Sequence, residues 1–197
     1  MNEVIIDPFT LFRFIGLLGS TATGLAVVKN SPYRNLKYWY SVDRPINIGT
    51  NGLGSPHHYY TYIFSKSMEL PLVPVPYKGI PQSLSDLLNG NIDAMWGSVA
   101  TLMPYEQAGK IEIIATLSPT RLPYAPDIPT FTELGYKVVA PTQWMLISNA
   151  SADDDTIRQI QNLFARIVTN KEHTLFTRTH VQPESEKYFY AERMLNK

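Results

Sequence analysis

The sequence contains no cysteine among its 197 residues. Disulfides, thiolate nucleophiles and Cys-ligated zinc or iron–sulfur sites are therefore excluded. An excess of charge of one sign is also missing, because 17 Lys and Arg balance 17 Asp and Glu. A net charge of zero provides no global field that would gather phosphates or anionic lipid, which argues against nucleic acid as a partner. Any anion site must be local and built from backbone groups and dipoles.

Long hydrophobic runs are missing as well. The longest apolar stretches, such as residues 14–18 and 25–28, are far shorter than the roughly 20 residues of a membrane-spanning helix. Residues 1–8 have neither a basic n-region nor an apolar h-region, so they do not form a secretory signal peptide. We therefore expect either a cytoplasmic protein or one whose export segment lies outside this sequence. With 44% hydrophobic residues, the chain can bury a sizeable core in one or two small domains.

Short β-type runs alternate with helical segments along most of the chain, which predicts an α/β protein with a mainly parallel sheet covered by helices. The predicted strands are residues 12–18, 25–29, 46–49, 72–75, 92–96, 111–116 and 144–147. The predicted helices are residues 56–67 and 83–89, one that ends at 105–108, one that follows residue 153, and two shorter stretches at the end of the chain. An apolar stripe at helical spacing marks the helix after residue 153. Residues 130–133 form a capping box, and four prolines make residues 117–129 a stiff surface loop.

The predicted elements divide into two lobes. The N-terminal stretch supplies too few strands for a domain of its own, and the helices after residue 153 also need a sheet to cover. The simplest arrangement brings both ends of the chain together in one lobe. Residues 30–144 then form the second lobe, and residues 1–29 and 145–197 form the remnant of the first.

A glycine-rich turn between a predicted strand and a predicted helix is the most informative local feature. It reads Gly49-Thr50-Asn51-Gly52-Leu53-Gly54-Ser55-Pro56. First-turn amides and the helix dipole bind carboxylate or phosphate, and the hydroxyls of Thr50 and Ser55 can donate as well. The spacing matches neither G-x-G-x-x-G nor a P-loop, so it gives little support to nucleotide binding. The pattern fits equally well a tight loop in which Ser55 is only a helix N-cap.

A second turn at residues 93–98 also follows a predicted strand. Strand ends of this kind face the ligand crevice in open α/β sheets, so the Gly97 amide and the Ser98 hydroxyl could face the same cleft as the first loop. We expect Asp93 to face neighbouring backbone instead. The alternative interpretation is a plain strand-to-helix turn.

The remaining polar residues show no catalytic machinery. His57 and His58 are adjacent and point roughly 100° apart on a helix, so they do not chelate one metal from one face. His173 and His180 stand alone, and no H-E-x-x-H, G-x-S-x-G or paired-carboxylate motif occurs. We therefore predict neither an enzyme nor a metal site nor a cofactor. The tyrosines near the two adjacent histidines, Tyr59, Tyr60 and Tyr62, are interpreted as structural.

Several motifs occur together in one order and spacing. They are VPYKG at 75–79, LSDLLNG at 84–90 with IDAM at 92–95, GT.G.GS..H at 49–58, P…AGKI at 104–111 and PDIPT at 126–130. In combination they resemble the signature of the substrate-binding proteins of tripartite tricarboxylate transporters, also called Bug proteins. The resemblance covers most of residues 7–185. Where the family often has Asp-Asn after the strand, this chain has Gly97-Ser98.

The resemblance implies a two-lobed periplasmic-binding-protein-like fold of type II, with the N-terminal part of the first lobe missing. It implies a periplasmic receptor that binds a small carboxylate, either a di- or tricarboxylate or an acidic amino acid, and presents it to a membrane permease. The implied ligand-binding residues lie in the two turns and the helix after the first: Gly49, Thr50, Asn51, Gly52, Gly54, Ser55, His58, Gly97 and Ser98. An incomplete first lobe would leave sheet surface exposed and favour self-association. The alternative is a non-binding relative that keeps the fold and acts as an interaction or scaffold protein.

Overall fold

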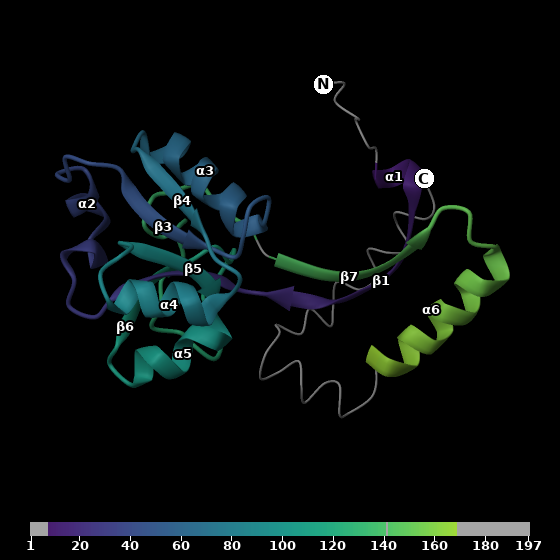
Figure 1. The fold of residues 1–197 in the computed structure, drawn as a ribbon. Helices are drawn as coiled ribbons and strands as arrows, with labels where there is room; N and C mark the ends of the chain where they lie inside the picture. The colour runs from purple at the N-terminus through teal and green to yellow at the C-terminus, as the bar shows by residue number, and fades with distance from the viewer. Residues whose placement is uncertain (1–7, 141, 169–197) are drawn as a thin grey trace, which may run out of the picture. The chain divides into compact units, whose positions relative to one another are not determined.

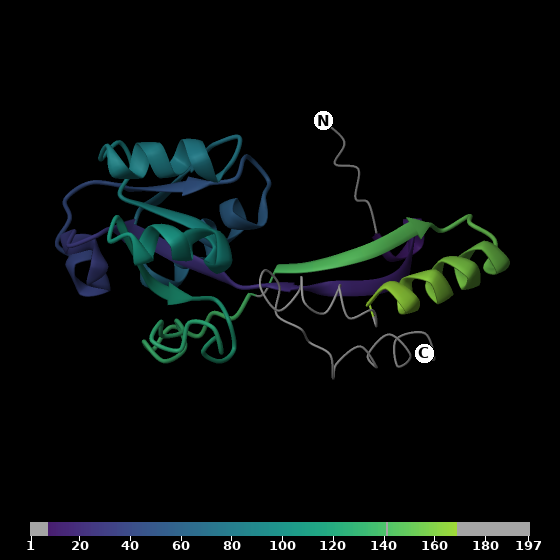
Figure 2. The ribbon, with the colours of Figure 1, turned by 90° about the horizontal axis from the view of Figure 1, so that it is seen from below.

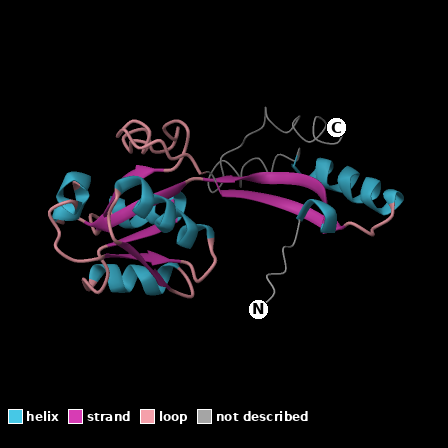
Figure 3. Ribbon diagram, turned by 90° about the horizontal axis from the view of Figure 1, so that it is seen from above, coloured by secondary structure: helices cyan, strands magenta, loops and turns pink. Residues whose placement is uncertain are grey.

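The computed structural model describes residues 8–140 and 142–168. The chain forms two compact units. Unit 1 consists of Met1–Thr21 and Gln143–Lys197, and unit 2 of Ala22–Thr142. Figure 1 labels the elements of both, and Figure 3 separates helices from strands by colour. The short helical stretches expected at the end of the chain, with His173 and His180, lie outside the described residues.

Unit 2 is built on a five-stranded sheet with the strand order β4-β3-β5-β2-β6. Its strands are β2 (Thr23–Val28), β3 (Ile46–Thr50), β4 (Leu72–Pro76), β5 (Ala94–Ser98) and β6 (Ile111–Thr116). Its helices are η1 (Pro32–Arg34), α2 (Leu36–Trp39), α3 (Pro56–Met68), α4 (Ile80–Leu88) and α5 (Val99–Gln107). Strand β3 is parallel to β4 and β5, whereas β2 is antiparallel to β5 and β6. Four of the five strands, β3, β4, β5 and β6, therefore run in the same direction, in agreement with the expected mainly parallel sheet, and only β2 of this sheet runs in the opposite direction.

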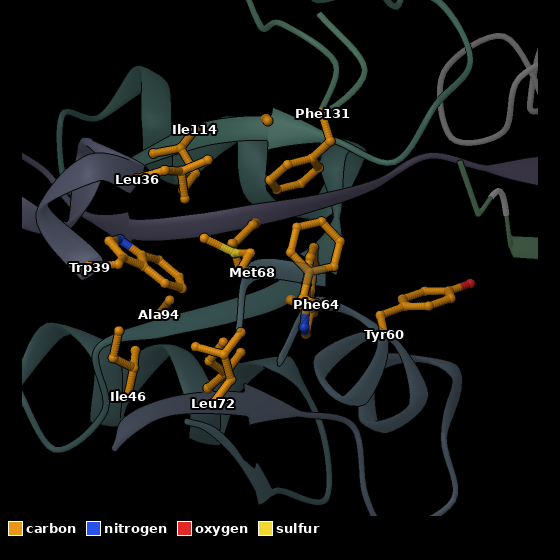
Figure 4. Close-up of a cluster of buried hydrophobic side chains, with 14 of the residues drawn as sticks. Leu36, Trp39, Ile46, Tyr60, Phe64, Met68, Leu72, Ala94, Ile114 and Phe131 are labelled. Carbon is orange, nitrogen blue, oxygen red and sulfur yellow. The ribbon is translucent and has the colours of Figure 1, made fainter. Parts of the chain in front are cut away.

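The two faces of this sheet carry two hydrophobic clusters. Alternate residues of one strand belong to different clusters: Ala94 and Trp96 pack on one face, and Met95 packs on the other. On the first face, the ring of Phe64 in α3 lies beside that of Phe131 (Figure 4), with a centroid distance of 4.5 Å. The Phe64 ring centroid is also 5.1 Å from that of Trp96. Residues of α4 and α5 fill the second cluster. Unit 2 thus has a core on both sides of its sheet.

Unit 1 contains a two-stranded sheet of β1 (Phe12–Thr21) and β7 (Thr142–Asn149), with the helices α1 (Pro8–Leu11) and α6 (Asp154–Val168). Helix α6 packs on β1 (Figure 2). A Cβ added to Gly16 of β1 would come within 2.3 Å of the Phe164 ring of α6, so only glycine fits at this contact. Arg13 holds the start of the same helix, since it donates to the Ala152 carbonyl at 2.8 Å and pairs with Asp154 at 2.8 Å.

The boundaries of the units differ from those expected from the sequence. Residues 22–29, which the sequence pattern assigned to the first lobe, contain β2 and therefore belong to unit 2. Every position of β2 except its last is buried, because the strand lies between β5 and β6. Four element starts also differ: α4 begins three residues before the predicted 83, β2 and β7 begin two residues before the predicted 25 and 144, and β5 begins two residues after the predicted 92.

Candidate functional site

Three parallel strands end at one edge of the unit 2 sheet. Because β3 runs parallel to β4 and to β5, the carboxyl ends of all three lie together, and each leads into a helix: α3, α4 or α5. In open α/β sheets, ligands bind in the crevice outside the carboxyl ends of the strands. We call the place formed by residues 49–58 and 97–98 the carboxyl edge. All nine residues predicted to bind ligand lie there.

The loop between β3 and α3 supplies the most accessible backbone of the carboxyl edge. Asn51 and Gly54 are exposed, and a Cβ added to Gly54 would meet nothing within 4 Å. Gly54 has φ +72° and Gly52 has φ +102°, which are conformations that favour glycine. Gly49, in contrast, is a packing residue, since a Cβ there would come within 2.8 Å of the Ile92 side chain. The open backbone of this loop therefore begins after β3.

The two hydroxyl groups expected to donate to a ligand donate within the chain instead. Ser55 Oγ donates to the Gly52 carbonyl at 2.8 Å and accepts from the His58 amide at 3.2 Å. Ser55 is thus the N-cap of α3, as in the alternative interpretation of the sequence. Thr50 is buried, and its hydroxyl donates to the Val75 carbonyl at 3.4 Å. Both side chains fix the shape of the loop, and the donors left for a ligand are backbone amides.

The end of β5 brings a second set of groups to the carboxyl edge. Gly97 is buried, and a Cβ there would come within 3.0 Å of Leu102, so this glycine allows α5 to pack closely. Ser98 is half-buried and occupies the N-cap position of α5 without making a side-chain capping hydrogen bond. Its hydroxyl therefore remains available at the start of a nine-residue helix.

A line of three hydroxyl groups next to Ser98 was not predicted from the sequence. Thr23, the register partner of Ser98, has its Oγ1 3.3 Å from Thr142 Oγ1, which lies 3.3 Å from Tyr60 Oη. The Tyr60 ring packs edge-on against Trp96 with a centroid distance of 6.2 Å. These residues are separated by up to 119 positions in sequence, so no local pattern could have joined them.

The histidines of α3 are enclosed in the fold. His57 is buried, and this burial lowers its pKa to about 4, so its imidazole is neutral at neutral pH. The Nδ1 atoms of His57 and His58 are both buried without a hydrogen-bond partner in the described structure. Among residues 8–140 and 142–168, no three His, Asp or Glu side chains are grouped so that they could hold a metal ion.

The tyrosines of α3 divide into two kinds. Tyr60 is buried as expected, whereas Tyr59 and Tyr62 are exposed. The Lys66 ammonium lies 5.7 Å from the Tyr62 ring centroid, which is a cation–π distance. Only Tyr60 therefore packs against the sheet.

Asp93 lies at the amino end of β5, away from the carboxyl edge. It accepts from the Asn47 amide at 2.9 Å, as expected, and also receives two hydrogen bonds from Arg44 at 2.8 and 2.6 Å. Burial opposes ionisation of Asp93, but the Arg44 and Asn47 hydrogen bonds outweigh it and lower the pKa of the carboxyl group. This pair therefore anchors the segment before β3 to the sheet.

Solved structures identify the class of fold. The chain aligns with the periplasmic binding protein BugD with a TM-score of 0.79 and 21% identity, over 96% of this chain and 66% of that chain. It aligns with MatC from Rhodopseudomonas palustris with bound malate with a TM-score of 0.79 and 17% identity, over 100% of this chain and 70% of that chain. The fold is therefore the α/β fold of periplasmic binding proteins, as predicted.

The sequence identifies the family. Residues 4–186 match the tripartite tricarboxylate transporter family receptor, and the chain belongs to this family. A protein encoded in the gbd 5' region of Cupriavidus necator is 24% identical over 164 residues, which is 81% of this chain and 50% of that protein. The chain thus spans about half the length of this curated relative. In the described part of the chain, no helix is long and apolar enough to cross a membrane.

Proposed function

We propose that the chain is a solute receptor that binds a small carboxylate at the carboxyl edge and delivers it to a membrane permease in the periplasm. The observation that carries this proposal is the exposed loop around Gly54, which places open backbone directly before α3. Membership of a receptor family and the malate bound to MatC support a carboxylate as the ligand. A di- or tricarboxylate or an acidic amino acid suits this site.

The ligand would be held by backbone groups and helix dipoles. The N-terminus of α3 carries a partial positive charge, and the amides of residues 52–54 lie beside it. At β5, the Gly97 amide and the Ser98 hydroxyl add donors at the start of α5. Because the chain has no net charge, these local donors must supply the attraction for the anion.

Two variants of Gly54 test this proposal. Gly54→Asp adds a carboxylate to open space at the N-terminus of α3, where it would repel an anionic ligand, whereas Gly54→Asn adds a side chain of the same shape without charge. Both side chains tolerate a positive φ comparatively well, so the backbone strain is matched. In calorimetric titrations with malate, adipate, citrate and glutamate, we expect Gly54→Asp to weaken binding at least about tenfold more than Gly54→Asn does.

Two results would contradict the proposed function. If the wild-type chain binds none of these carboxylates at millimolar concentration, the receptor hypothesis fails for this chain and the scaffold hypothesis is favoured. If it binds one and both Gly54 variants bind equally well, the ligand lies elsewhere.

The scaffold hypothesis is supported by the exposed apolar residues of β7, and we propose that the chain self-associates through unit 1.

A further inference from the structure

The chain contains two Asn-Gly pairs, and they occupy different local structures within unit 2. Asn51-Gly52 lies in the loop between β3 and α3, and Asn89-Gly90 directly follows α4. Asparagine is chemically labile, above all when a glycine without a Cβ follows it. Both asparagines are exposed, so access of water does not distinguish the two pairs. They differ in the backbone amide of the glycine.

The amide of Gly52 is free. In the described part of the chain, neither this amide nor the Asn51 side chain makes a hydrogen bond. Gly52 has φ +102° and no Cβ, so no side chain of its own blocks the approach of the Asn51 carboxamide to its nitrogen. The Gly52 carbonyl is held separately, because it accepts from the Ser55 hydroxyl at 2.8 Å.

The amide of Gly90 is engaged. It donates to the Leu87 carbonyl at 3.1 Å, and the Asn89 amide donates to the Ser85 carbonyl at 3.0 Å. These bonds close the last turn of α4, where Asn89 is the C-cap, and they hold the pair in one conformation. The same dipeptide thus occurs once with a free glycine amide and once with a bound one.

We propose that Asn51-Gly52 is a site of spontaneous deamidation, at which the chain modifies its own loop. The Gly52 nitrogen attacks Asn51 Cγ, the new N–C bond closes a succinimide ring, and the side-chain nitrogen leaves as ammonia. The proton lost from the Gly52 amide passes through solvent to this leaving group. Water then opens the ring at either carbonyl and gives aspartate or isoaspartate. The net change is the uptake of water and the loss of ammonia, without oxidation or reduction.

The product changes the charge of the carboxyl edge. Residues 49–58 contain no Asp, Glu, Lys or Arg, so the modification adds a negative charge to an uncharged segment. The new carboxylate lies close to the N-terminus of α3, where it competes with an anionic ligand for the helix dipole and repels it. Isoaspartate also lengthens the backbone of the loop. This effect on binding rests on the proposed function, whereas the modification itself does not.

Peptide mapping by mass spectrometry tests the site. The 197-residue chain is incubated in mildly alkaline buffer, which favours the deprotonated amide, and acid formation at Asn51 and Asn89 is followed in one sample. We expect Asn51 to react at least about tenfold faster, because reaction at Asn89 must first break the hydrogen bonds around Gly90. In concentrated urea, which unfolds the chain, the two pairs should react at similar rates.

Two substitutions control this measurement. Asn51→Gln should suppress acid formation at position 51, because a glutamine side chain has to close a larger and less favourable ring. Asn89→Gln should leave the rate at Asn51 unchanged.

Charge variants measure the consequence for ligand binding. Asn51→Asp has the same sequence as one reaction product, and Asn89→Asp adds the same charge at the end of α4 that lies away from the carboxyl edge. In calorimetric titrations with malate, adipate, citrate and glutamate, we expect Asn51→Asp to bind at least about tenfold more weakly than wild type. Asn89→Asp should bind as wild type does.

Three results would overturn the inference. The first is a rate at Asn51 no higher than that at Asn89 in the folded chain. The second is a rate difference that persists unchanged in urea, because the flanking residues rather than the fold would then determine it. The third, unchanged affinity in Asn51→Asp, would overturn the effect on binding. If the wild-type chain binds none of the four carboxylates, the proposed function fails, and the peptide map still decides whether Asn51 is the modification site.

Discussion

Strands β2 and β7 show how differently the interiors of the two units are packed. In β2, residues 23–27 are all buried between two neighbouring strands and under helices on both faces. In β7, most positions are exposed, and the buried apolar residues of unit 1 that the structure describes are Ile15 and Ile157. Since stability follows local burial, unit 2 should be the cooperative folding unit, and unit 1 should open at lower free energy.

The largest expected effect comes from removing an aromatic side chain from each unit. Phe64→Ala leaves a cavity between Trp96 and Phe131 and should lower the free energy of unfolding of unit 2 by about 3–5 kcal/mol. Phe164→Ala removes a half-buried ring from α6, so it should cost unit 2 nothing and affect unit 1 only.

Hydrogen exchange followed by mass spectrometry checks this difference, because it reports each unit separately. Phe64→Ala should accelerate exchange in β3 and β5, and Phe164→Ala should accelerate exchange only in β1 and α6. If Phe164→Ala destabilises β3 and β5 as strongly as Phe64→Ala does, the two units unfold as one and the comparison is wrong.

Within unit 2, the sequence predicted the parallel βα segments better than the place of β2, for a physical reason. The parallel βα segments of unit 2 are local, and signals such as Pro56 at a helix start or the Thr130–Glu133 capping box lie within a few residues of each other. The position of β2 in the sheet could not be predicted from such local signals, because long-range packing determines which strands become neighbours. A Cβ added to Gly24 would come within 2.8 Å of the Ile113 side chain in β6, so β2 fits tightly against this neighbour. The need for glycine at this position can be recognised only after the neighbouring strand is known.

The turn before α3 was predictable from the sequence, whereas the hydrogen bonds within it were not. The glycine pattern correctly indicated an open turn before α3, because Gly52 and Gly54 have positive φ values. The hydrogen-bond partners of Thr50 and Ser55 could not be predicted. The same hydroxyl group can donate to a ligand, cap a helix or donate to a neighbouring carbonyl, and the residue type does not distinguish these roles. The hydroxyl line through Thr142 depends on chain folding alone.

The pH dependence of stability gives the next largest effect, and it concerns unit 2. His57 is neutral and buried, with a folded pKa of about 4 against an ordinary value of 6.5. The unfolded chain therefore binds a proton that the folded chain does not, so stability is complete above pH 6.5 and falls as the pH drops toward 4. At ~1.4 kcal/mol per pH unit, the loss between pH 6.5 and 5 is about 2 kcal/mol.

Denaturant unfolding followed by tryptophan fluorescence at several pH values measures this loss. Two of the three tryptophans, Trp39 and Trp96, are fully buried in unit 2 and report on its unfolding. His57→Gln should make the curve flatter between pH 6.5 and 5. An unchanged slope in this variant would show that another group takes up the proton.

A smaller effect is expected from the ion pair at the amino end of the sheet. Asp93→Asn removes the charge that Arg44 contacts, and we expect a loss of about 1–2 kcal/mol because Arg44 is half-exposed to solvent. Since the pairing lowers the pKa of Asp93, its contribution is present above pH 3.8 and is lost as the pH falls through the folded pKa. Chemical denaturation should therefore show a difference between wild type and variant at pH 7 that shrinks below pH 4.

The smallest expected effect separates a structural role from a binding role at Ser55. Ser55→Ala removes the N-cap of α3 and should cost about 1 kcal/mol of unfolding free energy, because the His58 amide loses its acceptor. Ser55→Asp keeps an acceptor for this amide but adds a negative charge at the helix N-terminus. If Ser55 only shapes the loop, Ser55→Ala should leave carboxylate affinity within about threefold of wild type, whereas Ser55→Asp should preserve stability and abolish binding by repulsion.

Titration calorimetry and thermal unfolding on the same three proteins measure both quantities. Full stability together with a tenfold loss of affinity in Ser55→Ala would show instead that the hydroxyl group leaves Gly52 and donates to the ligand.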